Sequence, residues 1–293
     1  MKYLYYPGCS LDGTAKEYNT STLALMKSLG CELEEISDWY CCGSSAAEFT
    51  SRLLSLSLSA RVLAVAERMD VGNEILVPCS GCYLNLKNAE EQCKKDTKTF
   101  EKIKTILKED FLDFNNTMKT RHLLDVITMD IGPEPIKKAL KHSLEGFKIA
   151  PYYGCQCLRP HLVFDDPEEP HSMDSFIKAT GAEIFEWNMG GKCCGASNMI
   201  TKPNVALKLV KDILMKAKGA DAIVTVCPMC QMNLEAYQQK VSHESGQDLN
   251  ISILYLPQFL GLALGFKPSD LRLDLNLSLI DPFKSKIQPM LVA

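Results

Sequence analysis

The cysteines of this chain follow a single pattern that occurs twice. Each half contains, in order, a Gly-Cys pair, a Cys-Cys-Gly triplet and a Cys-x-x-Cys motif. In the first half these are Gly8-Cys9, Cys41-Cys42-Gly43, and Cys79 with Cys82. In the second half they are Gly154-Cys155, Cys193-Cys194-Gly195, and Cys227 with Cys230. Ten of the 13 cysteines therefore form two sets of five, and the chain is predicted to contain two similar units.

The repeat extends beyond the cysteines themselves. An Asn-Leu pair follows each Cys-x-x-Cys motif after three residues, at Asn85-Leu86 and at Asn233-Leu234. The intervals between the three motifs are also similar, with 31 and 36 residues in the first half and 37 and 32 in the second. Each Cys-x-x-Cys motif follows an apolar run, which is typical of a buried strand that ends in a loop.

Apolar stretches typical of buried strands alternate with stretches of helical composition. We expect strands at residues 2–6, 32–36, 74–77, 147–153, 183–187, 222–226 and 251–256. This alternation is typical of α/β proteins, so the predicted fold is two similar Rossmann-like βαβ domains with parallel sheets. The predicted domains are residues 1–145, which include a helical connection over 94–145, and residues 146–293. Cysteine clusters are expected at the carboxyl ends of the strands, where such sheets bind ligands.

Local signals set the expected helix boundaries. Thr14 and Glu17 have the spacing of a capping box, and Ser172 is expected to cap a helix of the second half. Residues 47–70 have the composition of one long helix. Residues 122–127 are interpreted as an apolar helix within the connection.

Charge and hydropathy narrow the class of protein. The net charge is −4 and the pI is about 5.8, which argues against a general nucleic-acid binder. The amino-terminal residues lack the apolar stretch of a signal peptide, and residues 251–266 are too short to span a bilayer. We therefore expect a cytoplasmic protein without a membrane anchor of its own. Because the cytoplasm is reducing, its cysteines are expected to bind metal rather than to form disulfides.

Five thiolates in each half constrain the metal. Structural zinc takes four tetrahedral ligands, and ordinary four-iron clusters also use four cysteines. Two adjacent cysteines place their sulfurs too close for most single-metal sites, whereas they suit a site that contains several irons. The pattern thus favours an unusual iron–sulfur cluster in each half. Two alternatives stay open here: zinc sites that only hold the fold together, and redox-active dithiols of the thioredoxin type.

The doubled pattern resembles the cysteine-rich CCG domain, which occurs twice in the B subunit of heterodisulfide reductase. It also occurs in iron–sulfur subunits of thiol:fumarate reductase, glycolate oxidase and lactate-utilisation systems. The resemblance covers nearly the whole chain and is closest over residues 78–85, 153–160 and 258–265. It implies two non-cubane 4Fe–4S clusters. The implied iron ligands are Cys9, Cys41, Cys42, Cys79, Cys82, Cys155, Cys193, Cys194, Cys227 and Cys230.

The resemblance also implies an activity. The substrate would be the mixed disulfide of coenzyme M and coenzyme B, which methanogenic archaea reduce to two thiols. Cleaving a disulfide takes two electrons and iron–sulfur clusters pass one at a time, so two facing clusters would each supply one. The alternative is an electron-relay subunit, with iron–sulfur clusters alone or with zinc, of another CCG-domain oxidoreductase such as thiol:fumarate reductase or glycolate or lactate oxidase.

Partner subunits follow from the same resemblance. No Gly-x-Gly-x-x-Gly motif follows any expected strand, so we expect electrons to come from another chain. The implied partners are flavin- and iron–sulfur-containing reductase subunits that resemble the A and C subunits of the soluble heterodisulfide reductase complex. A hydrogenase is a further partner that the resemblance admits.

Three more residues are candidates for the implied reaction. His161 is the candidate proton donor. Arg159 and Lys192 are candidate contacts for the substrate, which carries sulfonate, phosphate and carboxylate groups in the implied reaction. The acidic loop 165–169 is a poor contact for such an anion, so we expect it to face solvent or a partner subunit.

The remaining three cysteines are weaker candidates. Cys31 and Cys93 are expected to be ordinary core or surface residues. Cys157 lies two residues after Cys155, where it is a possible rival for that position in the second set. The second ligand set is therefore less well defined by the sequence than the first.

Overall fold

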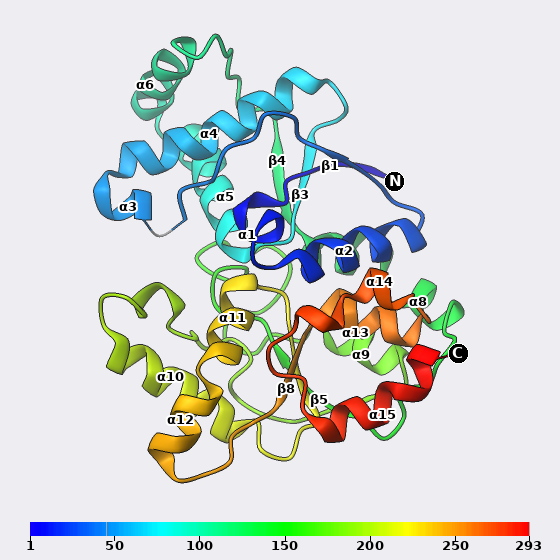
Figure 1. Ribbon diagram of the computed structural model, residues 1–293. Coiled ribbons are helices and arrows are strands. Elements are labelled where there is room, and N and C mark those ends of the chain that lie inside the picture. The colour runs from blue at the N-terminus through cyan, green and yellow to red at the C-terminus, as the bar shows by residue number, and fades with distance from the viewer. Residues whose placement is uncertain (45, 293) are drawn as a thin grey trace.

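Two four-stranded parallel sheets form the centre of the molecule. The computed structural model describes residues 1–44 and 46–292 (Figure 1). The sheets have the strand orders β2-β1-β3-β4 and β6-β5-β7-β8, so each half has the same topology. The first sheet contains β1 (Lys2–Tyr5), β2 (Glu32–Glu35), β3 (Glu74–Val77) and β4 (Lys119–His122). The second contains β5 (Lys148–Tyr152), β6 (Glu183–Ile184), β7 (Ala222–Thr225) and β8 (Ser252–Tyr255).

Helices cover the sheets. The helices of the first half are α1 (Gly8–Asp12), α2 (Lys16–Ser28), α3 (Ala46–Thr50), α4 (Arg52–Met69), α5 (Ser80–Lys95), α6 (Thr97–Lys108), α7 (Leu123–Val126), the π-helical turn η1 (Ile127–Ile131) and α8 (Glu134–Lys138). Those of the second are α9 (Asp174–Ala179), η2 (Ala196–Asn198), α10 (Pro203–Lys216), α11 (Pro228–Ala236), α12 (Gln238–Ser245), α13 (Leu256–Ala263), α14 (Pro268–Leu271), η3 (Leu273–Leu275) and α15 (Asp281–Val292). Strands β7 and β8 are buried throughout, as expected for a parallel sheet covered on both faces. The predicted α/β fold with two similar units and parallel sheets is confirmed.

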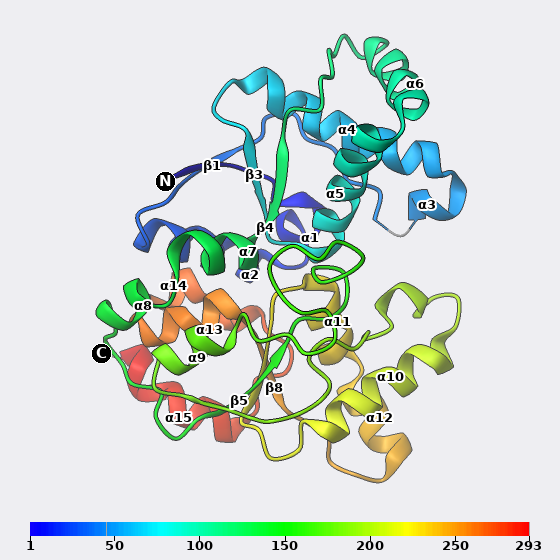
Figure 2. The same ribbon diagram turned by 180° about the vertical axis from the view of Figure 1, so that it is seen from behind.

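The two halves exchange contacts near their boundary. Helix α2 belongs to the first half but packs against α13 and α14 of the second half. In the same way, α8 of the first half packs against α9 of the second. Figures 1 and 2 show these helices next to one another, near the boundary between the two halves. The halves are therefore held in a fixed relation by helices that cross from one to the other.

The sequence missed one strand. Residues 119–122 read Lys-Thr-Arg-His, a polar run that does not resemble a buried strand, and His122 was expected to begin a helix. The structure instead forms β4, which pairs with β3 at the position that β8 occupies in the second sheet. Most of its buried polar groups have partners: the Thr120 amide donates to Glu90 over 2.9 Å, and Arg121 binds Asp125. The Thr120 hydroxyl has no partner among the described residues. Residues 94–145 are therefore not only a connection, because they complete the first sheet.

Three helix boundaries also differ from the expected ones. Helix α2 begins after Ala15, and Thr14 makes no capping hydrogen bond to it. The predicted helix over 47–70 is interrupted at Ser51, whose hydroxyl caps α4 by accepting from the Leu54 amide. Helix α9 begins after Met173, so Ser172 does not cap it either. Cap patterns of one or two residues are weak signals when tertiary packing decides where a helix starts.

Membrane-spanning helices are not part of the described structure. Over residues 1–44 and 46–292, no helix combines the length and the hydropathy that crossing a bilayer would require.

The buried ion pair of β4 generates a stability prediction. Replacing Arg121 by Met leaves Asp125 buried without its partner, which lies 2.8 Å away, and we expect a loss of about 3–5 kcal/mol in the free energy of unfolding. The matched control is Lys119→Met on the same strand, because Lys119 pairs with Glu74 in a more exposed position and should change stability by less than about 1 kcal/mol. Denaturant unfolding followed by circular dichroism measures both. Equal effects of the two substitutions would contradict the prediction.

Candidate functional site

The first set of five cysteines gathers at the carboxyl ends of three strands. Cys9 follows β1, Cys41 and Cys42 follow β2, and Cys79 and Cys82 lie at the start of α5 after β3. The Sγ atoms of Cys9 and Cys41 are 3.6 Å apart, and those of Cys42 and Cys82 are 3.4 Å apart. The neighbouring thiols of Cys41 and Cys79 also lie close enough to raise the pKa values of Cys42 and Cys82. The structure therefore brings all five of these side chains together.

The second set has the same arrangement around β5, β6 and β7. The Sγ atoms of Cys194 and Cys230 are 3.5 Å apart. All five cysteines of this set line one small hollow. In both sets some cysteines are buried and others reach the surface: Cys9, Cys41 and Cys193 are exposed. Each set thus has a buried side within the fold and an open side towards solvent.

A glycine makes room for the sulfurs in each half. Gly8 has a φ of +69° and Gly154 a φ of +70°, a backbone conformation that favours glycine. A Cβ at Gly8 would lie 2.8 Å from the Sγ of Cys82, and a Cβ at Gly154 would lie 2.8 Å from the Sγ of Cys230. The Gly-Cys pairs therefore need glycine both for the turn after the strand and for the close approach of a cysteine sulfur.

The Asn-Leu pairs of the repeat explain part of the geometry. The Asn85 side-chain amide donates to the Cys42 carbonyl over 3.1 Å, and the Asn233 amide donates to the Cys194 carbonyl over 2.7 Å. Both asparagines are buried. They fix the Cys-Cys-Gly loop of each half against the helix that carries the Cys-x-x-Cys motif. The sequence pointed to these residues by their repetition, although it did not reveal their role.

The cysteines of each set differ in acidity. Hydrogen bonding from Cys42 and from the Gly43 amide lowers the pKa of Cys41 to about 5. The corresponding residue of the second set, Cys193, has its pKa lowered to about 6 by hydrogen bonding to Cys155 and to the Gly195 amide. Thiolate is the form of cysteine that binds metal, so the backbone amides favour the binding-competent form at these exposed positions.

The two Cys-x-x-Cys motifs meet at the boundary between the halves. The Ser80 hydroxyl, inside the first motif, donates to the Val226 carbonyl, directly before the second motif, over 3.2 Å. A Cβ at Gly81 would lie 3.2 Å from Oε1 of Gln156 and 3.5 Å from Sδ of Met229. The absence of a side chain at Gly81 thus lets the two motifs approach each other.

A buried histidine supports this contact. The Nδ1 atom of His122 accepts from the Leu124 amide over 3.1 Å, so its proton lies on Nε2, which donates to the Ser80 hydroxyl over 3.2 Å. Burial lowers the pKa of His122 to about 3, which keeps the imidazole neutral. The histidine tautomer therefore sets the direction of two hydrogen bonds: His122 donates to Ser80, and Ser80 donates to the Val226 carbonyl. No sequence pattern indicated this role, because His122 lies in the unexpected strand.

A tyrosine also links the two Cys-x-x-Cys motifs. The Tyr18 hydroxyl lies 3.1 Å from the carbonyl of Pro78 and 3.1 Å from that of Val226, which directly precede the two motifs. Its ring stacks on the Tyr255 ring with a centroid distance of 4.0 Å. Tyr18 comes from α2, the helix that crosses between the halves, so the exchange of helices places the two cysteine sets next to each other.

Each set of five cysteines is a candidate site for a metal cofactor. Among the described residues, no group of three or more His, Cys, Asp or Glu side chains is already arranged to hold a metal ion. The hollow between the cysteines of the second set measures about 40 Å³, which is room for a few waters at most. A cluster would require these sulfurs to move apart, and the partly exposed Cys155 and the exposed Cys193 are the ones free to move outward. The five thiols that line this hollow are soft donors of the kind that iron–sulfur clusters use.

The other three cysteines lie outside the two sets. Cys157 is buried, and its thiol donates to the Tyr153 carbonyl over 3.3 Å. It does not line the hollow formed by the second set. Cys31 and Cys93 are buried among apolar side chains of the core, as expected for ordinary core residues.

His161 lies against the first half rather than between the sets. Its Nε2 is 2.8 Å from the Asn88 Oδ1, and burial lowers its pKa. It lines an open pocket of about 190 Å³ together with Glu48, Arg52 and Glu91. No hydrogen bond joins it to any of the ten cysteines within the described part of the chain.

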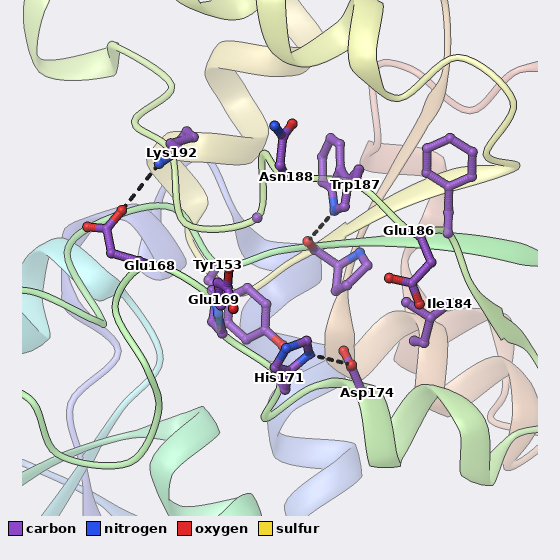
Figure 3. Close-up of a pocket in the computed structure, with 14 residues that line it drawn as sticks. Tyr153, Glu168, Glu169, His171, Asp174, Ile184, Glu186, Trp187, Asn188 and Lys192 are labelled. Atoms are coloured by element: carbon purple, nitrogen blue, oxygen red, sulfur yellow. Dashed lines mark hydrogen bonds and ion pairs between the residues drawn. The ribbon is translucent and has the colours of Figure 1, made fainter.

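The two predicted substrate contacts are held by one carboxylate. Glu168 binds Arg159 over 2.6 Å and Lys192 over 3.3 Å, and Arg159 also donates to the Gly191 carbonyl. Lys192 lines a pocket of about 470 Å³, which Figure 3 shows. The same pocket is lined by the acidic residues Glu168, Glu169, Asp174 and Glu186. None of the ten cysteines lines it, and its acidic wall is a poor match for an anion.

Comparisons with known proteins agree with the doubled site. The profile of the CCG cysteine-rich domain matches residues 3–87 and again residues 149–235. The chain is 33% identical over 279 residues to the 8-methylmenaquinol:fumarate reductase membrane anchor subunit of Wolinella succinogenes, covering 94% of this chain and 96% of that one. It is 32% identical to the B subunit of the ferredoxin:CoB-CoM heterodisulfide reductase of Methanosarcina mazei, over 75% of each chain.

A solved structure supports the fold. A hypothetical protein from Helicobacter pylori matches with a TM-score of 0.77 and 17% identity, over 95% of this chain and 52% of that one. The chain thus spans about half the length of that protein. The two matched segments and the two relatives above 30% identity show that the chain belongs to the CCG cysteine-rich domain family and carries two copies of the domain.

Proposed function

We propose that this chain is the catalytic iron–sulfur subunit of a multi-subunit disulfide reductase, with one non-cubane 4Fe–4S cluster in each set of five cysteines. The proposed substrate is the CoB–CoM heterodisulfide, which is named for the Methanosarcina relative. The observation that supports the proposal best is the direct contact between the two Cys-x-x-Cys motifs through Ser80 and Val226. Two sites that lie this close can act together on one bond.

The chemistry follows from electron counting. Reduction of a disulfide takes two electrons and two protons, and two bound clusters would supply one electron each. The buried side of each set is held by the glycine turn and by the Asn85 or Asn233 hydrogen bond. The exposed residues Cys9, Cys41 and Cys193 lie where a disulfide from solution can reach the site. Electrons would come from flavin- and iron–sulfur-containing partner subunits, and a hydrogenase is included as a further electron source.

Three residue roles belong to this proposal. Arg159 and Lys192 are proposed contacts for the anionic substrate, and Glu168 would have to release them before they could bind it. His161 is a proposed proton donor, although its hydrogen bond to Asn88 directs it towards the first half. The proposed compartment is the cytoplasm.

A second function is favoured by the comparison with the Wolinella protein. That relative is a subunit of an 8-methylmenaquinol:fumarate reductase, and its similarity covers more of the chain than that of the Methanosarcina mazei subunit. In this alternative the two cysteine sets relay electrons from a quinol to a partner subunit that reduces fumarate. The two functions share the cofactors and differ in the substrate.

Turnover of defined substrates tests the proposed function. Anaerobically purified chain with its clusters, supplied with a one-electron dye as donor, is expected to reduce the heterodisulfide to two thiols. The thiols are counted with a chromogenic reagent, and the same preparation is assayed for oxidation of a menaquinol with a dye as acceptor. Quinol oxidation without disulfide reduction would overturn the proposed function and support the alternative.

Iron analysis tests the ligand sets. The chain purified without oxygen is expected to hold about eight irons. Cys42→Ser and Cys194→Ser should each lose about half of them, because each removes a ligand from one set only. The matched controls are Cys157→Ser and Cys93→Ser, which should keep the full iron content. Loss of iron in Cys157→Ser with retention in Cys155→Ser would show that Cys157 replaces Cys155 as a ligand.

The glycine turns provide a more selective test. Gly8→Ala adds a Cβ 2.8 Å from the Sγ of Cys82 and is expected to lower the iron content of the first set. Gly30→Ala is the control, since Gly30 has a similar φ of +74° but nothing within 4 Å of its Cβ position. Both substitutions strain the backbone by about 1–2 kcal/mol, so only the contact with sulfur differs between them. The measurements are iron per chain and the cluster absorption, and equal iron loss in both variants would refute the contact argument.

A further inference from the structure

Helix α11 carries an unusual line of buried polar residues. Cys227, Gln231 and Glu235 are four residues apart, so they lie on one face of the helix. All three are buried. Cys227 belongs to the second cysteine set, whereas Glu235 lines an open pocket of about 340 Å³ on the outside. The line thus leads from solvent to the site over about 12 Å of helix.

Several polar atoms along this line have no protein partner. Both amide atoms of Gln231 are buried, and no hydrogen-bond partner for either occurs among the described residues. The same holds for Oε2 of Glu17 and the hydroxyl of Thr225 in the part of the chain that the structure describes. Buried polar groups are nearly always hydrogen-bonded, and bound water provides the bond when the protein does not. The orphaned atoms therefore indicate positions for internal water.

A buried tyrosine of β8, the strand that packs against α11, lies near both ends of the line. Tyr255 is fully buried, and the negative charges of Glu17, Glu235 and Cys227 all act on its hydroxyl and raise its pKa, after the larger effect of burial. Its ring stacks on Tyr18, whose hydroxyl reaches the carbonyls that precede both Cys-x-x-Cys motifs. Tyrosine hydroxyls both donate and accept hydrogen bonds, so they can pass a proton without a net charge.

We propose that Glu235, Gln231 and Tyr255 form, with bound water, the route by which protons reach the space between the two cysteine sets. The inference rests on the proposed function, in which cleavage of one S–S bond consumes two electrons from a partner subunit and two protons from solvent. The two protons form the S–H bonds of the two thiols. In the alternative quinol reaction, the same route would carry the two released protons outward.

Glu235 has the acidity that this role requires. Burial raises its pKa to about 7, and the nearby charge of Glu17 raises it as well. The carboxyl group is therefore protonated below about pH 7 and ionised above it, close to ordinary working conditions. The titratable groups around it are Glu17 on α2, which itself lies near Arg272 and Asp274, and Tyr255 on β8. The Ser278 hydroxyl donates to the Glu235 carboxylate over 3.2 Å.

The described part of the first half carries a different group at the equivalent position. The position that corresponds to Glu235, eight residues after the first cysteine of the motif, is Lys87. Lys87 is buried and bound to Glu90 over 2.9 Å. The repeat is therefore broken at this position, where the second half has a carboxyl group and the first half has a paired amine.

The first experiment needs neither clusters nor substrate. Infrared titration of the whole chain is expected to show a carboxylic acid band that disappears as the pH rises through about 7. The band should be absent in Glu235→Gln and present in Glu244→Gln, a matched control at an exposed position of α12. A chain without this band at pH 6, or a band that persists in Glu235→Gln, would overturn the proposal.

The second experiment measures turnover as a function of pH in the cluster-loaded chain. Glu235→Gln should lower kcat by roughly 10²-fold and abolish the decrease in rate that the wild type shows above about pH 7. Gln231→Met keeps the packing volume and should also slow turnover, whereas Glu244→Gln should not. Iron content reports whether each variant retains its clusters. A variant Glu235→Gln with full iron content, the wild-type rate and the wild-type pH profile would refute the route.

Chemical rescue separates proton transfer from a structural role. Glu235→Ala leaves space next to the open pocket, so added acetic acid should restore part of the lost rate, more at low pH than at high pH. A slow variant that retains its iron and is not rescued would count against proton transfer through Glu235. If the wild type turns over neither a disulfide nor a quinol, the proposed function fails, and the infrared titration still decides whether Glu235 is a protonatable group near pH 7.

Discussion

The arrangement of the two cysteine sets depends on a group of hydrogen bonds that cross between the halves at the Val226 carbonyl. The Tyr18 hydroxyl and the Ser80 hydroxyl both bind the Val226 carbonyl, and Tyr18 also binds the carbonyl of Pro78. These carbonyls directly precede the two Cys-x-x-Cys motifs. Because α2 crosses from the first half to pack on α13, Tyr18 is delivered to this point by the packing of apolar helix faces. Two domains joined only by a mobile linker would not hold their cysteine sets at a fixed distance from each other. The crossing helix α2 therefore keeps the two cysteine sets next to each other.

Within each half, the sheet topology brings the cysteines together. Three parallel strands end at the same edge, and the loops that follow them each contribute one or two sulfurs. The glycine turn and the asparagine hydrogen bond then fix the backbone while leaving the thiols without other strong partners. Five thiols that contact mainly one another stabilise the fold little by themselves, because thiols are weak hydrogen-bonding groups. Their close grouping is better explained by metal binding, which would supply the missing interaction energy.

The sequence predicted the parts of the molecule that repeat. The strand–cysteine order identified the sheets, the edge at which the cysteines gather and the two sets of five, because each of these features is local and occurs twice. The sequence did not predict β4, where Thr120, Arg121 and His122 are buried and polar. The Thr120 amide and the His122 ring find their partners, Glu90 and Ser80, far away in the sequence. It also gave no warning that Glu168 would bind both Arg159 and Lys192, since an ion pair between loops leaves no periodic pattern. Contacts of this kind become visible only when the chain is folded.

The differences between the halves are as informative as the repeat. A pair of sites that reduce one disulfide needs two electrons in total, and symmetric cysteine sets suit that equal division. Protons need not arrive symmetrically, because one route can serve both product sulfurs if these lie close together. In the first half, the position equivalent to Glu235 is occupied by Lys87, which is buried and paired with Glu90. In the second half, Glu235 lines a pocket on the outside of the molecule. Lys87 is paired with a carboxylate at this position, whereas Glu235 is a desolvated carboxyl group with a pKa of about 7, which can take up and release a proton. The symmetry is thus preserved where electrons would be handled and is broken where protons would enter.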